Sequence, residues 1–577
     1  GRCAPPRMAS AGVELQQRAA DPGAVAEPAE AIGMSSTEES EEVEDNHDHS
    51  TGSSEEVKPG DEAGREEEPS WTSWAGLFLG PTLALMLGLV LSLAGPSSML
   101  LSARRLVGVT AWMAVWWMTE AVPLGITSLL PLVMFPVLGI LDQSVVATCY
   151  SSSISWLFFG GFQLAFAVER TGLHRRLAFG VLRCVGTRPP CMMLGVMLSV
   201  AVLSMFLSNT STTLMILPVA EAMTVSLGDG EASEQLQLFG KALMLGLAYA
   251  ASMGGLGTLI GTPPNGVLAA QAETFDLNIT FSRWMLFAAP LAIIMVVFTW
   301  LYLVVFFRVP RAGFGTGHPS QKPPHGELGR MSQAERRVAV VFALTVLAWM
   351  LRKPVVSALH LPKGRLEDCT ISIAATILLF IVPARDGMGR SSWLMDWQTL
   401  LKTPWHILFL FGGGFALAKA FEETLLSAWI GARLSMLQDL PTMLTTFLIV
   451  LVVTFLTEVT SNTATANVLL PIIGQLALTL GVRPVTLMVP ATMAASCAFM
   501  LPVATPPNAI VFATKRVRMK DMAQTGLFLN FVTAAIITVW MFTWGTLWFD
   551  LSSPVADPST AGLPSTATQP QPSSVHL

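Results

Sequence analysis

Two short polar motifs interrupt otherwise apolar stretches, and their residue types can bind ions. The first, Ser208-Asn209-Thr210, lies within the apolar run 190–224, and the second, Ser461-Asn462-Thr463, lies within 441–480. Neither run contains Lys or Arg. The side-chain oxygens of serine, threonine and asparagine are neutral, hard ligands, which suit Na+ far better than a soft metal. The two motifs therefore predict sites for an alkali cation.

Each polar motif is followed by a second interruption that contains proline. Thr262-Pro263-Pro264-Asn265 follows the first motif, and Thr505-Pro506-Pro507-Asn508 follows the second. Proline inside a helix removes a backbone hydrogen bond and breaks the helix. One interpretation is that the Ser and Thr side chains only tie the broken backbone together. The other is that they coordinate an ion and an anion, and we favour it because the complete set occurs twice.

A helix that begins at such a polar turn can also bind an anion. Its first backbone N–H groups lack partners, and the positive end of its dipole points at the turn. This arrangement binds carboxylate, phosphate or sulfate without a basic side chain. A dianion held there would need its positive counter-charge from bound cations. Binding of the dianion would then be strengthened by Na+, which is the coupling that a symporter requires.

The composition is that of a membrane protein. Of the 577 residues, 52% are hydrophobic and 13% are charged, whereas a soluble domain carries about 25% charged residues. The six cysteines are too few for a disulfide scaffold in so long a chain, and they show no CxxC spacing. The scattered charge and high apolar content argue against a nucleic-acid partner. We expect no organic cofactor.

The two ends of the chain differ from its apolar middle. Residues 1–70 contain 18 acidic and 5 basic residues and few apolar ones, so they cannot bury enough surface to fold. We predict a disordered acidic cytoplasmic tail over 1–70, a membrane transporter domain over 71–550, and a disordered extracytoplasmic tail over 551–577. This orientation places most basic loops in the cytoplasm, as the positive-inside rule requires, although the basic cluster at 352–365 is an exception. We expect the plasma membrane as the location.

The order of the motifs indicates an internal duplication. A Phe/Gly-rich segment precedes each polar motif, at 158–162 and at 411–415, and Ser208 and Ser461 are 253 residues apart. Each half then holds five membrane-crossing helices and one re-entrant hairpin, after a single extra helix. An odd number of crossings inverts the second half, as in many secondary transporters. We predict an all-α polytopic membrane protein with 11 transmembrane helices and two re-entrant hairpins in inverted repeats.

With these motifs the chain resembles the divalent anion/sodium symporter family, which includes the sodium-coupled di- and tricarboxylate and sulfate cotransporters. The resemblance covers about residues 75–550 and depends on the two Ser-Asn-Thr motifs and the stretch Leu501–Asn508. It implies a homodimer that works by an elevator motion. The transport domain would comprise about 153–271 and 403–515, and it would move against a scaffold of about 75–141, 284–383 and 523–550.

The resemblance also implies ligands for two Na+ ions and one substrate. The first Na+ site would use Ser204, Ser208, Asn209 and the carbonyl of Gly261. The second would use Thr457, Thr460, Asn462 and the carbonyl of Ala504. Substrate contacts would come from Ser208, Asn209, Thr262, Ser461, Asn462, Thr463, Thr505 and Pro506.

We therefore predict a Na+-coupled symporter of small dicarboxylates such as succinate, fumarate and malate. In the family, a proline at the position of Pro506 is linked to four-carbon dicarboxylates. The alternatives are a citrate or sulfate symporter, or a Na+-independent dicarboxylate exchanger, on the same scaffold. The sequence leaves the substrate rank and the number of Na+ ions open.

Other classes of function fit less well. Intramembrane proteolysis needs a Ser and a His on facing helices, or two buried Asp, whereas the central polar clusters here contain Ser, Thr and Asn, so we expect no enzyme and assign no catalytic residue. An anion channel would show a continuous polar or basic pore. Glu458 is interpreted as a structural acid, with direct ion binding as the alternative. Asn278-Ile279-Thr280 matches the glycosylation pattern on a segment expected outside the cell.

Overall fold

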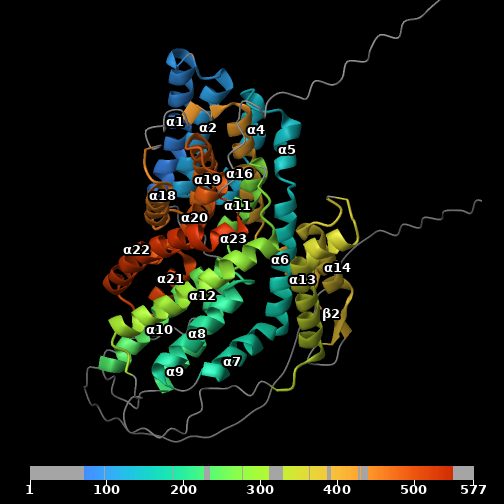
Figure 1. Cartoon of the computed structure of the whole chain (residues 1–577), viewed down its shortest axis with the longest axis vertical. Coiled ribbons are helices and arrows are strands. Elements are labelled where there is room, and N and C mark those ends of the chain that lie inside the picture. Colours follow the sequence, from blue (N-terminus) through green and yellow to red (C-terminus); the bar gives the residue numbers. More distant parts are fainter. Residues whose placement is uncertain are drawn as a thin grey trace, which may run out of the picture. The chain divides into compact units, whose positions relative to one another are not determined.

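The computed structural model of the chain is built almost entirely from helices (Figure 1). It describes residues 71–551, with gaps at 97, 186–187, 227–233, 276, 311–328, 363, 386–390, 427–428, 431–438 and 550. Apart from Leu551, the two predicted tails lie outside the described residues. Within the described part, the strands are one short antiparallel pair, β1 (Pro383–Arg385) and β2 (Ser391–Trp393). The predicted all-α class is confirmed.

The first half of the chain forms twelve helices as far as it is described. In chain order these are α1 (Trp71–Ala94), α2 (Leu101–Thr119), α3 (Leu124–Thr127), α4 (Leu130–Val137), α5 (Gln143–Cys149), α6 (Ser153–Thr171), α7 (Leu173–Val185), α8 (Pro189–Ser204), α9 (Asn209–Ser226), α10 (Glu234–Gly255), α11 (Pro263–Thr274) and α12 (Phe281–Phe306).

The second half follows a similar plan after its first two helices, with the basic 352–365 segment at the end of the first and in the connection between them. Its elements are α13 (Gln333–Ala358), α14 (Asp368–Ile381), α15 (Trp397–Leu401), α16 (Trp405–Glu423), α18 (Thr442–Leu456), α19 (Asn462–Thr479), α20 (Pro484–Ala495), the short 3-10 helix η3 (Pro502–Ala504), α21 (Pro506–Ala513), α22 (Met519–Thr543) and α23 (Gly545–Trp548).

Six described segments are long and apolar enough to cross a membrane as single helices, and five shorter apolar helices accompany them. Polar or proline-containing interruptions divide most of the remaining apolar runs, which shortens the helices on either side. The polytopic architecture is confirmed, whereas the count of 11 spans remains a prediction.

The four predicted interruptions occur as breaks between helices. The first polar motif separates α8 from α9, and the second separates α18 from α19. The proline-containing motifs separate α10 from α11 and α20 from α21. In each half, the helix that follows the pair of helices joined at the polar motif packs against both of them: α10 packs against α8 and α9, and α20 packs against α18 and α19. The duplicated sequence therefore forms duplicated structure.

The two halves are interlocked through the short helices beyond the proline breaks (Figure 1). Helix α11, from the first half, packs against α19 and α20 of the second half. Helix α21, from the second half, packs against α9 and α10 of the first. The four helices that begin at the polar or proline motifs are α9, α11, α19 and α21. Helices from the motifs of one half therefore contact helices from the motifs of the other half.

Two long helices lie along these interlocked elements. Helix α12 packs along α10 and α8, and α22 packs along α18 and α20 (Figure 1). The close approach of α22 to the second break depends on a glycine. A Cβ atom at Gly526 would lie 2.4 Å from the carbonyl carbon of Phe499, closer than Cβ atoms are found in proteins. Glycine at this position lets α22 touch the broken backbone directly.

A buried carboxylate holds the second proline-containing break. Glu458, 3% exposed, accepts hydrogen bonds from the backbone N–H groups of Phe499, Met500 and Leu501 at 2.7–3.1 Å. It also accepts one from Nδ2 of Asn530 in α22, at 2.8 Å. The N–H groups freed by the break thus find the internal partners that a membrane environment demands. These contacts support the structural interpretation of Glu458.

We expect Glu458→Gln to destabilise the protein. The glutamine amide nitrogen cannot accept a hydrogen bond, so at least one freed backbone N–H loses its partner, which costs about 1–3 kcal/mol. The midpoint of thermal unfolding of the purified protein in detergent should fall. Glu422→Gln is the matched control, because Glu422 forms an ion pair with Lys419 at 3.0 Å with both side chains part-exposed, and such pairs contribute about 0–1 kcal/mol. Equal midpoints for the two variants would contradict the assigned role of Glu458.

Candidate functional site

The first polar break gathers oxygen atoms around one hydroxyl group. Ser204, the last residue of α8, places its Oγ 2.6 Å from Oδ1 of Asn209 and 2.7 Å from the carbonyl oxygen of Ala251 in α10. A hydroxyl carries a single hydrogen, so it can fully satisfy only one of these two oxygens at a time. Three oxygens with one shared hydrogen form an electron-rich cluster, and such a cluster favours a cation.

The second polar break repeats this arrangement. Thr457, directly after α18, places its Oγ1 2.7 Å from Oδ1 of Asn462 and 2.8 Å from the carbonyl oxygen of Ala495 in α20. Thr457 replaces Ser204, Asn462 replaces Asn209, and Ala495 replaces Ala251. The same shortage of hydrogens recurs in the second half, although the two hydroxyl residues differ in type.

Glycines bring further carbonyl oxygens to the first cluster. A Cβ atom at Gly255 would lie 2.6 Å from Oδ1 of Asn209 and 3.2 Å from the carbonyl oxygen of Gly261. A Cβ atom at Gly261 would lie 2.9 Å from the carbonyl oxygen of Met205. Both positions must be glycine for these oxygens to approach. Gly261, which the sequence predicts as a carbonyl ligand, thus lies in the same oxygen-rich place as Asn209.

The asparagines of the two Pro-Pro-Asn motifs hold the breaks together. Nδ2 of Asn265 donates to the carbonyl oxygens of Thr258 at 2.7 Å and Gly255 at 3.2 Å. Nδ2 of Asn508 donates to the carbonyl oxygens of Ala498 at 3.1 Å and Leu501 at 3.0 Å. Both side chains are fully buried, and neither Oδ1 has a hydrogen-bond partner among the described residues. Sequence reasoning quoted both asparagines in the motif but gave them no role.

Two serines were missed as well. Ser252 and Ser496 directly follow Ala251 and Ala495, the alanines whose carbonyls contact the cluster hydroxyls. Each serine is 1% exposed, and its Oγ has no hydrogen-bond partner in the described part of the chain. The signal was available, because Ala-Ala-Ser occurs at 250–252 and again at 494–496. Each half therefore has an unpartnered buried hydroxyl at the residue next to the alanine whose carbonyl contacts the cluster.

The predicted substrate residues lie at the starts of helices. Ser208 directly precedes α9, Thr262 precedes α11, Ser461 precedes α19 and Thr505 precedes α21. Asn209, Asn462 and Thr463 occupy the first turns of α9 and α19, and Pro506 is the first residue of α21. The oxygens of Ser208 and Thr505 each accept from a backbone N–H three residues on, at 3.1 and 3.4 Å. In α9 and α19, first-turn N–H groups that remain unpaired can bind an anion. Helices α11 and α21 begin with two prolines, which carry no N–H, so Thr262 and Thr505 can contribute mainly their hydroxyls.

The structure joins some predicted ligands more directly than others. Ser204 is hydrogen-bonded to Asn209, and Thr457 is hydrogen-bonded to Asn462. The carbonyl of Gly261 lies near Asn209. Thr460 differs, because its Oγ1 donates to the carbonyl of Leu456 at 2.9 Å and lies 2.6 Å from Oγ1 of Thr465. Ala504 ends η3 immediately before Thr505.

Comparison with known proteins identifies a family and several relatives of similar sequence. Residues 72–551 match the family model described as the sodium:sulfate symporter transmembrane region. The sodium-dependent dicarboxylate transporter SdcS of Staphylococcus saprophyticus is 38% identical over 471 residues, which cover 80% of this chain and 90% of the relative. SdcS of Staphylococcus aureus (strain USA300) is 40% identical over 468 residues, covering 80% and 89%.

A solved structure, that of Neisseria gonorrhoeae MtrF, matches with a TM-score of 0.49 and 11% identity, over 83% of this chain and 96% of that one; so weak a likeness carries no weight beside the sequence matches. The matched relatives are named transporters, in agreement with the expectation that the chain is not an enzyme. With a family model that spans nearly the whole helical region, and relatives at about 40% identity, the chain belongs to the sodium:sulfate symporter family.

Proposed function

We propose that the chain is a Na+-coupled symporter of four-carbon dicarboxylates such as succinate, fumarate and malate. The observation that carries the proposal is the doubled oxygen cluster, in which one hydroxyl hydrogen is shared among several oxygens. The names of the matched relatives support both the ion and the class of substrate.

In this proposal two Na+ ions complete the two clusters. The first ion would be held by Ser204, Ser208, Asn209 and the carbonyl of Gly261, and the second by Thr457, Thr460, Asn462 and the carbonyl of Ala504. Neutral oxygen ligands bind Na+ without the strong attraction of a carboxylate, so the ions can also be released. Ser252 and Ser496, whose hydroxyls lack partners in the described part of the chain, directly follow the alanines whose carbonyls contact these clusters.

The dicarboxylate would lie between the four helix starts. The proposed contacts are Ser208, Asn209, Thr262, Ser461, Asn462, Thr463, Thr505 and Pro506. Hydroxyl, amide and backbone N–H donors can bind a carboxylate, and the adjacent Na+ ions supply the positive charge that the apolar runs lack. Because two Na+ ions balance one dianion, the loaded site is electrically neutral and can move within the membrane at low electrostatic cost.

Transport by an elevator motion requires a moving unit and a fixed one. The helices that carry the motifs form one interlocked group, and α12 and α22 pack along it. We therefore assign α12 and α22 to the moving unit, although the sequence-based boundaries put residues 284–383 and 523–550 in the scaffold. The remaining scaffold segments would form the interface of a homodimer.

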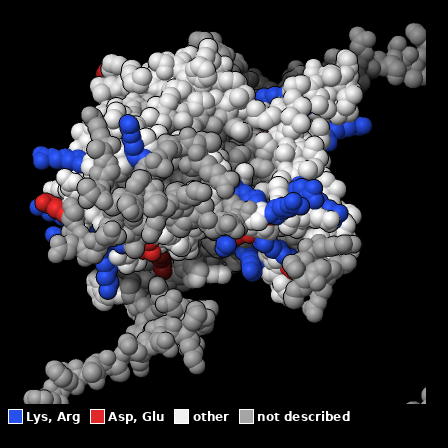
Figure 2. Space-filling model, turned by 90° about the horizontal axis from the view of Figure 1, so that it is seen from below, with Lys and Arg blue, Asp and Glu red and all other residues white. Residues whose placement is uncertain are grey.

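We further propose a plasma-membrane location, with the N-terminus in the cytoplasm and the C-terminus outside. The face that lies lowest in Figure 1 shows more Lys and Arg than Asp and Glu side chains (Figure 2), as expected for a cytoplasmic surface.

Ion replacement tests the coupling. The purified protein in proteoliposomes should take up radiolabelled succinate when the outside buffer contains NaCl, and uptake should fall to background when choline replaces Na+. Malate and fumarate should compete, whereas sulfate and citrate should compete weakly. Unchanged uptake in choline would indicate a Na+-independent exchanger and contradict the proposal. Strong competition by sulfate would instead favour the substrate that the family description names.

Substitution of the cluster asparagines tests the site. Asn209→Ala and Asn462→Ala each remove an oxygen proposed to contact both Na+ and substrate, so we expect at least a ~10-fold loss of uptake, equivalent to about 1.4 kcal/mol. Expression and thermal stability should change little, because each lost hydrogen bond contributes about 1 kcal/mol. Asn278→Ala is the control, since Asn278 is exposed. Loss of folding rather than of transport would show that the asparagines only support the backbone.

A further inference from the structure

A buried tryptophan contacts the backbone of the first proline-containing break. Trp284, in the first turn of α12, is fully buried, and its Nε1–H donates to the carbonyl oxygen of Leu256 at 2.9 Å. Leu256 is the first residue after α10 ends at Gly255, so the indole binds the broken segment where it leaves the helix. Nδ2 of Asn265 lies 3.4 Å from the same carbonyl.

The segment that Trp284 binds adjoins the first oxygen cluster. The Gly255 position touches both Asn209 and the carbonyl of Gly261, and Asn265 binds the Gly255 carbonyl as well as that of Leu256. The carbonyls from 255 to 261 therefore form one connected turn. A shift of Leu256 would move the oxygens that surround Asn209.

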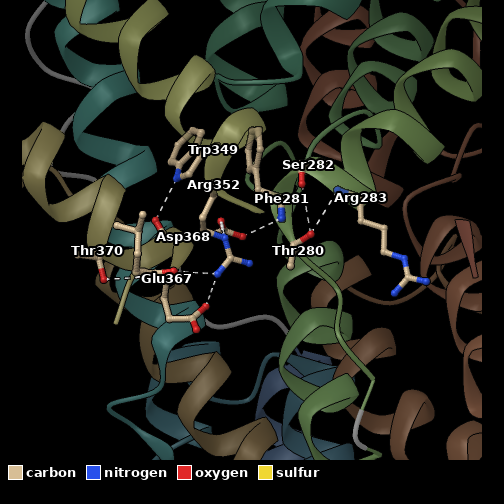
Figure 3. Close-up of polar contacts among 10 residues, drawn as sticks. Thr280, Phe281, Ser282, Arg283, Trp349, Arg352, Glu367, Asp368 and Thr370 are labelled. Atoms are coloured by element: carbon tan, nitrogen blue, oxygen red, sulfur yellow. Dashed lines mark hydrogen bonds and ion pairs between the residues drawn. The ribbon is translucent and has the colours of Figure 1, made fainter. Parts of the chain in front are cut away.

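The same turn of α12 is fixed from its other side by the α13–α14 pair. The backbone N–H of Phe281 donates to Oδ2 of Asp368 at 2.9 Å, and the Phe281 ring packs on Trp349 with centroids 4.3 Å apart. Nε1 of Trp349 in turn donates to the carbonyl of Asp368 at 2.9 Å. Figure 3 shows these groups converging on the start of α12. Asp368 thus binds a backbone donor that the first turn of a helix leaves unpaired.

Arg352 supports this contact by holding the Asp368 carboxylate in place. Its Nε lies 2.7 Å from Oδ1 of Asp368, its Nη1 lies 2.5 Å from Oε2 of Glu367, and the arginine is only 9% exposed (Figure 3). Breaking such a buried ion pair by removing one partner is strongly destabilising, because the other charge is left unpaired. In this conformation of the protein, the α13–α14 pair therefore holds the first turn of α12 in place.

The second proline-containing break, between α20 and α21, has different partners. Its carbonyl at Phe499 accepts from the hydroxyl of Tyr249 at 2.8 Å, and its N–H groups are bound by Glu458. These side chains come from α10 and from the second polar break, within the interlocked group. The first break is instead bound by Trp284 at the start of α12, and Asp368 of α14 binds the same turn of α12. This link to α13 and α14 distinguishes the first site from the second.

We propose that Trp284 is a positioning residue for the first Na+ site, and that the Asp368–Phe281 contact connects this site to the α13–α14 pair. The inference rests on the proposed Na+ site at Ser204, Asn209 and Gly261. The indole N–H fixes the Leu256 carbonyl and so keeps the neighbouring oxygens arranged for the ion before it binds. An arranged site binds more tightly because less ordering is needed on binding.

The test is the Na+ dependence of succinate uptake by Trp284→Phe in proteoliposomes. Phenylalanine keeps an aromatic ring in the core and removes the N–H donor. We expect the half-saturating Na+ concentration to rise about fivefold, equivalent to ~1 kcal/mol, while maximal uptake at saturating Na+ is retained. Trp540→Phe is the matched control. Trp540 lies in α22, and its indole donates to the carbonyl of Phe287 in α12 at 3.1 Å rather than to the broken segment. Its Na+ dependence should match that of the unmodified chain.

A second variant tests the connection to α13 and α14. Replacing Arg352 and Asp368 together by alanine removes the contact to Phe281 without leaving either of these two charges alone in the core. The half-saturating Na+ concentration should rise, and the rise should be smaller when Trp284→Phe is already present, because both changes act through the same turn. This double variant also tests the proposal if Trp284→Phe does not fold.

The outcomes separate the inference from the proposed function. If uptake by the unmodified chain is the same in choline as in Na+, the proposed function fails. If uptake by the unmodified chain depends on Na+ but the Na+ titrations of Trp284→Phe and of the double alanine variant superimpose on it, the positioning role is overturned. A fall in maximal uptake with an unchanged half-saturating Na+ concentration would also overturn it.

Discussion

Backbone that leaves helical geometry within a membrane must find hydrogen-bond partners inside the protein, because lipid offers none. Four breaks in this chain are subject to that constraint. The amide groups of Asn265 and Asn508 satisfy freed carbonyls, and Glu458 satisfies freed N–H groups. The folded state of the central region depends on these few buried polar side chains, since apolar packing cannot replace the lost backbone bonds.

The same constraint explains how a stable structure can also bind an ion. In each polar cluster one hydroxyl lies within hydrogen-bond distance of two oxygens. The hydroxyl supports the backbone, but one of the two oxygens is left without a full hydrogen bond. In the proposed function, a cation would satisfy the oxygens that the single hydrogen cannot. Because the clusters occur twice and the helices beyond the breaks pack across the two halves, two ions and one dianion can be brought into one neutral group. The two halves are not identical, since the first break is additionally fixed to α13 and α14 through Trp284 and Phe281.

The positions of the breaks followed from the sequence because polar and proline residues stand out within apolar runs. The cluster residues Ser204 and Thr457 came from the resemblance to the symporter family, and the structure places each beside the asparagine of its motif. The buried, unpartnered serines Ser252 and Ser496 were missed although the Ala-Ala-Ser repeat was visible, because small residues in apolar helices are common. The partners of Trp284 and Asp368 could not be found, since those contacts join segments 28 and 87 residues apart. The grouping of α12 and α22 depends on three-dimensional packing, which composition does not encode.

The most direct measurement of the central claim is a structure determined with succinate in NaCl, compared with one determined in choline chloride without Na+. The account predicts, in Na+ only, density for one dicarboxylate between the starts of α9 and α19, with a separate ion beside Ser204 and Asn209 and another beside Thr457 and Asn462. Succinate bound at the same place in choline, or bound in Na+ away from both asparagines, would contradict it.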